Sequence, residues 1–120
     1  MDIHEASRLY KQNSLLLLSP NKLLLKLLEE AIKALREAKK AMIENDISEK
    51  NKQIQVSQQL ILELIPLINT SIDNGEQIII VIDYVNRKLI EINMKNDITM
   101  LNGIESFLLD FRAAWNENKV

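Results

Sequence analysis

Residues that break helices are scarce in this sequence: its 120 residues include only two glycines and two prolines. Glycine and proline supply much of the chemistry of tight turns, so the chain should have few connections and long secondary-structure elements. Leucine, lysine, glutamate and glutamine are common among the remaining residues, and all four favour helices. The sequence therefore predicts an all-helical protein.

Length and charge narrow the classes of function. A chain of this length suits one domain with a single core. The formal net charge of -2 provides no basic excess for binding a nucleic-acid backbone. The absence of cysteine excludes a disulfide scaffold and thiolate zinc sites, and it fits a reducing compartment. We expect a single domain, residues 1–120, that lies in the cytoplasm and does not bind nucleic acid.

The leucine-rich stretch that begins at Asn13 does not predict a membrane segment. A spanning helix needs about 20 consecutive apolar residues, whereas the uninterrupted leucine run covers only residues 15–18. A secretory signal starts with basic residues and ends at a small-residue cleavage site. Here Asp2 and Glu5 lie near the start of the chain. We therefore expect no membrane insertion.

Apolar residues recur at spacings of three and four, which places them on one side of a helix. Ser19-Pro20 predicts the start of a first helix, which ends near Asn45. Ser48 is expected to cap a second helix, which Pro66 kinks or terminates. The stripe of the first helix comprises Leu24, Leu28, Ala31, Leu35, Ala38 and Met42, and that of the second comprises Ile54, Ile61 and Ile68.

The third segment, residues 76–97, fits two interpretations locally. Its five consecutive apolar residues, Ile78 to Ile82, suit a buried strand because β-branched residues favour strands. However, the three–four spacing continues through Val85, Leu89 and Ile92, and a lone strand would have no partner, so we predict a helix. A fourth helix begins near Ile98, and its stripe comprises Leu101, Ile104, Leu108, Phe111 and Trp115.

Four amphipathic helices joined by short loops predict an antiparallel, up-down-up-down four-helix bundle. We assign residues 19–120 to the bundle and residues 1–18 to a short N-terminal segment packed across it.

No residues are arranged for catalysis or metal binding. His4 is the only histidine, and nothing in the sequence positions it as a base. Gly75 and Gly103 are isolated, so there is no glycine-rich phosphate loop. Glu-x-x-His pairs, which bind metals in helical bundles, are also absent. We expect neither an enzyme nor a bound cofactor.

Some apolar residues lie off the main stripes, among them Ile79, Ile80 and Ile90 in the third helix. Two explanations remain open. The bundle core is wide, or an apolar groove on the outside receives another segment.

Four blocks of sequence resemble one protein family. They are YKQNSLLLLSPNKL at Tyr10, AMIENDISEKNKQI at Ala41, IDYVNRKLIEINMKND at Ile82 and LLDFRAAWNE at Leu108. Together, in this order, they resemble FliS, the flagellar export chaperone family. The resemblance extends over nearly the whole chain, and the third block is the most specific.

The resemblance implies a small helical bundle in the bacterial cytoplasm. Such a protein binds the disordered C-terminal segment of flagellin in apolar grooves, blocks its premature polymerisation and presents it to the export gate. The family's N-terminal segment can cover part of that surface. Here the covering segment would include Tyr10, Gln12, Asn13, Leu15 and Leu16.

This sequence also departs from the family pattern. Asn21-Lys22 stands where a glutamate usually follows Ser-Pro, and Val81-Ile82 stands where Leu-Tyr usually precedes Asp-Tyr. The groove is therefore less aromatic than usual, which leaves a divergent flagellin or another secreted client open. A self-associating helical scaffold is the alternative from a different class, and the sequence does not decide between a monomer and a homodimer.

The candidate client-binding residues come from the second and third helices. Periodicity indicates Ile54, Ile61, Ile79 and Ile90 as groove residues. Tyr84 would pack by its ring and bond by its hydroxyl, while Arg87 and Asn93 would hold backbone carbonyls of the client. The competing roles are core packing for Tyr84 and an ion pair with Glu91 for Arg87. Trp115 and Phe111 are expected to close one end of the core.

Overall fold

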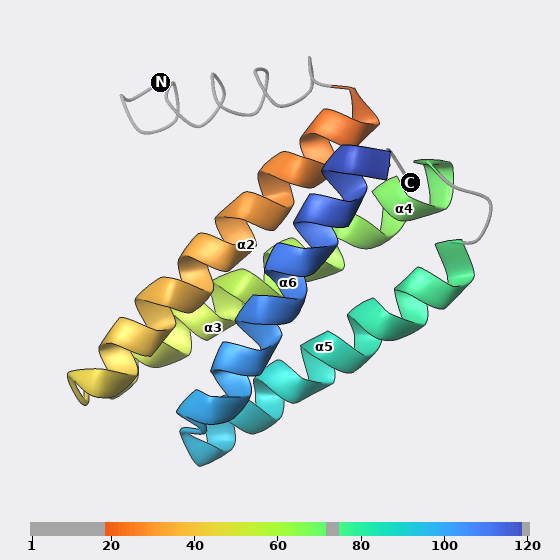
Figure 1. Cartoon of the computed structure of the whole chain (residues 1–120). Helices are drawn as coiled ribbons and strands as arrows, with labels where there is room; N and C mark the ends of the chain where they lie inside the picture. The colour runs from red at the N-terminus through yellow and green to blue at the C-terminus, as the bar shows by residue number, and fades with distance from the viewer. Residues whose placement is uncertain (1–18, 72–74, 119–120) are drawn as a thin grey trace, which may run out of the picture.

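The computed structural model describes residues 19–71 and 75–118, and the described part of the chain is helical without strands (Figure 1). This arrangement confirms the all-helical prediction and forms a four-helix bundle. Residues 78–82 are helical, which excludes the strand interpretation. The helices are α2 (Pro20–Ile43), α3 (Ile47–Leu62), α4 (Leu64–Ser71), α5 (Gly75–Lys95) and α6 (Ile98–Asn118).

One arm of the bundle is interrupted. α3 and α4 follow each other with a break at Glu63, and together they form the second arm. α2 packs most extensively against α3 and also contacts α4 and α6, whereas α5 contacts α3, α4 and α6. α5 therefore lies beside the second arm and also packs against α6.

The predicted stripes form the core. In α2 the whole predicted stripe is buried, and Ser19 caps the helix by accepting a hydrogen bond from the Lys22 amide at 3.3 Å. Trp115 is 2% exposed and stacks on Phe111 with ring centroids 5.9 Å apart, as expected for the closure of one end. The fully buried large side chains include Leu24, Leu28, Ile32, Leu35, Ile54, Ile61, Leu64, Ile68, Ile82, Leu89, Ile92, Leu101 and Leu108.

The turns α2–α3 and α5–α6 use the same residues in the same way. Asn45 and Asn96 adopt positive φ angles of 58° and 53°, which asparagine tolerates better than most residues. Asp46 and Asp97 follow them, and each carboxylate accepts a backbone hydrogen bond from the next helix, at 3.1 Å and 2.9 Å. The expected capping role of Ser48 is therefore wrong, because Asp46 caps α3 and places Ser48 in its first turn.

The break between α3 and α4 lies earlier than the expected kink at Pro66. Proline has no N–H, so Pro66 cannot donate a hydrogen bond to the carbonyl four residues earlier, at Leu62. α3 ends at that residue, and Pro66 lies in the first turn of α4, where its missing donor costs least. α5 then starts at Gly75, where a Cβ would lie 3.3 Å from atoms of Ile68. Glycine at this position permits the close approach of α5 to α4.

Candidate functional site

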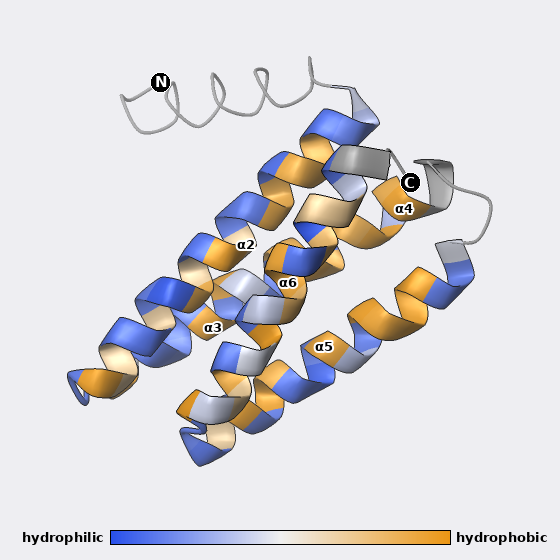
Figure 2. Ribbon diagram, in the orientation of Figure 1, coloured by the Kyte–Doolittle hydropathy of each residue, from blue (hydrophilic) through white to orange (hydrophobic). Residues whose placement is uncertain are grey.

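The outer face of α5 exposes apolar side chains opposite its core stripe. The exposed fractions are 67% for Ile80, 52% for Tyr84, 47% for Ile90 and 80% for Met94. Their spacing places all four within roughly a third of the helix circumference. We call these four residues the α5 surface. Figure 2 shows that apolar colouring covers much of α5, especially its first half, rather than a single narrow stripe.

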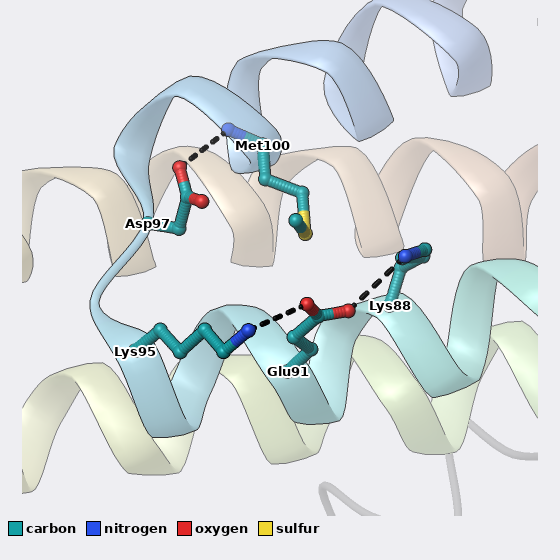
Figure 3. Close-up of polar contacts among 5 residues, drawn as sticks. All are labelled: Lys88, Glu91, Lys95, Asp97 and Met100. Carbon is teal, nitrogen blue, oxygen red and sulfur yellow. Dashed lines mark hydrogen bonds and ion pairs between the residues drawn. The ribbon is translucent and has the colours of Figure 1, made fainter.

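Charged residues accompany the α5 surface. Asp83 and Arg87 form an ion pair at 3.2 Å within it. Along one edge, Glu91 bonds Lys88 at 3.1 Å and Lys95 at 2.9 Å (Figure 3). The hydrogen bonds from Lys95 and Lys88 lower the pKa of Glu91, and the bond to Glu91 raises the pKa of Lys88. Glu91 and Lys88 therefore stay ionised at neutral pH, at an edge that borders the apolar face.

The other edge of the α5 surface offers hydrogen-bond acceptors. Asn86 and Asn93 have buried Oδ1 atoms without a hydrogen-bond partner among the described residues. The backbone carbonyl of Asn93 accepts a hydrogen bond from Lys50 of α3 at 3.0 Å, so this edge lies beside α3. A buried acceptor without a donor is costly, so each of these two side chains would gain from turning toward a donor.

Five of the predicted client-binding residues come together on α5. Tyr84, Arg87 and Ile90 are exposed, while Ile79 and Asn93 are half-buried at the edge. Tyr84 is therefore no core residue. Contact of these five with a client stays a prediction.

Ile54 and Ile61 require a correction as groove residues. Both are 0% exposed, because their seven-residue spacing places them on the core stripe of α3. In this fold they line the interior and form no accessible groove. The expected pair of Arg87 with Glu91 is also wrong, because Arg87 pairs with Asp83 while Lys88 and Lys95 occupy Glu91.

The predicted covering segment lies outside the described residues. It comprises Tyr10, Gln12, Asn13, Leu15 and Leu16. Ile80 and Met94 were not among the predicted client-binding residues, although both positions lie opposite the core stripe. Helical spacing had placed Ile80 off the stripe, and the same spacing could have identified Met94.

A second feature lies at the end of the bundle where the two Asn-Asp turns meet. A pocket of about 300 Å³ opens between the α2–α3 turn and the α5–α6 turn. We call it the tip pocket. It adjoins the last turn of α5, where Met94 ends the α5 surface. Its lining residues are Ala41, Met42, Asn45, Asp46, Ile47, Lys50, Asn96 and Ile98.

The described helices contain none that is both long and apolar enough to cross a membrane.

Comparison with known proteins gives the family. The profile of the family described as "Flagellar protein FliS" matches residues 3–119. The flagellar secretion chaperone FliS of Bacillus subtilis (strain 168) is 33% identical over 117 residues, which cover 98% of this chain and 88% of that protein. Both matches span almost the whole chain, in agreement with the four sequence blocks. The chain therefore belongs to the FliS family of flagellar proteins.

Proposed function

We propose that this protein is a cytoplasmic export chaperone that binds the disordered C-terminal segment of flagellin on the α5 surface. Bound there, the segment is kept from premature polymerisation until the subunit reaches the export gate. Membership of the FliS family supports the chaperone role, since the relative in Bacillus subtilis is a flagellar secretion chaperone. As a member of a chaperone family, the protein is not an enzyme.

The exposed apolar face of α5 is the observation that carries the proposal. A disordered client loses conformational entropy when it is ordered, so binding must bury a large apolar area, of order 1,000–3,000 Å². The α5 surface extends from Ile80 to Met94, about 21 Å at the rise of an α-helix. That length accommodates about four turns of an amphipathic client helix. The rest of the area would come from the neighbouring helices.

The polar groups of α5 give the client its orientation. Asp83 and Arg87 form an exposed ion pair, and such pairs contribute little to stability, so both side chains are available to a client. The Oδ1 atoms of Asn86 and Asn93 are buried without a hydrogen-bond partner in the described part of the chain, so these side chains would have to turn outward to bind polar groups of the client. Contact of Asn93 with client carbonyls stays a prediction.

Calorimetric titration with a peptide covering the last ~50 residues of flagellin from the same organism, a length chosen to match such an interface, tests the proposal. We expect binding near one to one with a large negative heat-capacity change, because apolar surface is buried. No binding to a folded, monomeric protein would contradict a flagellin chaperone. Mass that rises with concentration in the absence of peptide would instead favour a self-associating scaffold.

A further inference from the structure

The tip pocket combines an apolar wall with a buried cation. Met42, Ile47 and Ile98 contribute the apolar side, and Ile47 is 64% exposed at its mouth. Lys50 lines the same pocket although it is only 5% exposed. The tip pocket therefore brings a buried lysine and apolar side chains together beside the C-terminal end of α5.

Lys50 is held by hydrogen bonds and not by an ion pair among the described residues. Its Nζ donates to the Asn93 carbonyl at 3.0 Å and to Asn96 Oδ1, which uses two of its three N–H groups. The C-terminus of α5 offsets only about half a positive charge. None of the ion pairs within residues 19–71 and 75–118 involves Lys50. A desolvated cation without a carboxylate partner favours an anionic ligand.

Asp46 also lines the tip pocket, and its negative charge would repel an anion there. Its Oδ1 atom accepts the Glu49 amide hydrogen bond at 3.1 Å, so this carboxylate is engaged in capping α3. The remaining polar groups, from Asn45 and Asn96, are neutral. A single carboxylate that reaches Lys50 is the anion that this lining suits.

We infer that the tip pocket binds the C-terminal carboxylate of the client chain, with the last apolar side chain against Met42, Ile47 and Ile98. A chain-terminal residue of an apolar type carries its carboxylate and its apolar side chain on one Cα, which matches a lysine beside an apolar wall. Asn96, which directly follows α5, lines the pocket, so a client that lies along α5 reaches it at the end of the bundle. This inference rests on the proposed function and adds the direction of the bound chain.

The test compares two forms of the same flagellin C-terminal peptide, one with a free carboxylate and one with a C-terminal amide. Amidation removes the negative charge and leaves Lys50 without its partner, so the dissociation constant should rise at least about tenfold. In the Lys50→Met variant the two peptides should bind equally. Should that variant fail to fold, the comparison on the unaltered protein still decides the matter.

A matched pair of variants controls for general effects at this end of the bundle. Ile43 and Ile47 are both 64% exposed, but only Ile47 lines the pocket. Ile47→Ser should weaken binding of the free-acid peptide, and Ile43→Ser should not.

Equal binding of the two peptides to the unaltered protein would overturn the inference and leave the proposed function intact. If Lys50→Met still weakened binding in that case, the carboxylate would come from a client side chain. If neither peptide bound, the inference and the proposed function would both be wrong.

Discussion

Substitutions at two adjacent residues of α5 should affect different properties, one the stability of the fold and the other the binding of the client. Leu89 is 0% exposed in the core, whereas Ile90 is 47% exposed on the outer face. Leu89→Ala removes a fully buried side chain and should cost about 2–5 kcal/mol of the free energy of unfolding. That loss lowers the melting temperature by roughly 10 °C or more. Ile90→Ala should change stability by less than about 1 kcal/mol, since alanine is the better helix former.

The affinity for the client should depend more on Ile90 than on Leu89. Complete burial of an isoleucine side chain contributes roughly 1.5–3 kcal/mol, and about half of the Ile90 surface remains to be buried by a client. Truncation to alanine should therefore cost about 1 kcal/mol of binding, or about fivefold in the dissociation constant. Leu89→Ala, assayed below its melting temperature, should bind nearly as well as the unaltered protein.

Thermal unfolding followed by circular dichroism, together with calorimetric titration of the flagellin peptide, measures both effects. Equal destabilisation by the two substitutions would mean that Ile90 belongs to the core. Unchanged affinity of Ile90→Ala would mean that the client does not cover this face.

Three further predictions concern stability. Gly103→Ala should raise the free energy of unfolding by about 0.5–1 kcal/mol, since a Cβ there meets nothing within 4 Å. Gly75→Ala should give no such gain, because its Cβ would contact Ile68. Urea unfolding of the two variants measures the difference. Asp97→Ala should cost about 1 kcal/mol in the same assay, because it removes the cap on the Met100 amide; an unchanged midpoint would exclude this role. The lowered pKa of Glu91 stabilises the fold above its ordinary pKa of 4.5, and this contribution disappears as the pH falls through the folded-state value. Glu91→Gln should therefore be less stable than the unaltered protein at neutral pH and approach it in acid; a stability difference independent of pH would contradict the linkage.

Helical periodicity predicted the core well because burial follows directly from the side of the helix on which a residue lies. The stripe from Leu24 to Met42 is buried throughout, and Val85, Leu89 and Ile92 pointed correctly to a helix rather than a strand. Ser19-Pro20 also marked the start of α2, since capping depends on neighbouring residues alone.

The sequence was less informative where two neighbouring residues could both cap a helix, or where burial depends on packing between helices. Asp46 and Ser48 are both good caps, and only the positive φ angle of Asn45 places Asp46 at the helix start. The periodicity that linked Ile54 and Ile61 is the same for a core stripe and a groove, so it could not distinguish inside from outside. No local pattern in the sequence distinguishes Lys50 from a surface lysine, because its burial depends on contact with α5.

The measurement that tests the α5 surface most directly is methyl NMR of isoleucine-labelled protein, free and bound to the flagellin peptide. Ile80 and Ile90 report on the outer face, and the buried Ile54 and Ile61 report on the core. We predict large shifts of the Ile80 and Ile90 methyl signals at saturation and small shifts of the two core residues. Binding that leaves Ile80 and Ile90 unshifted would contradict a client site on α5.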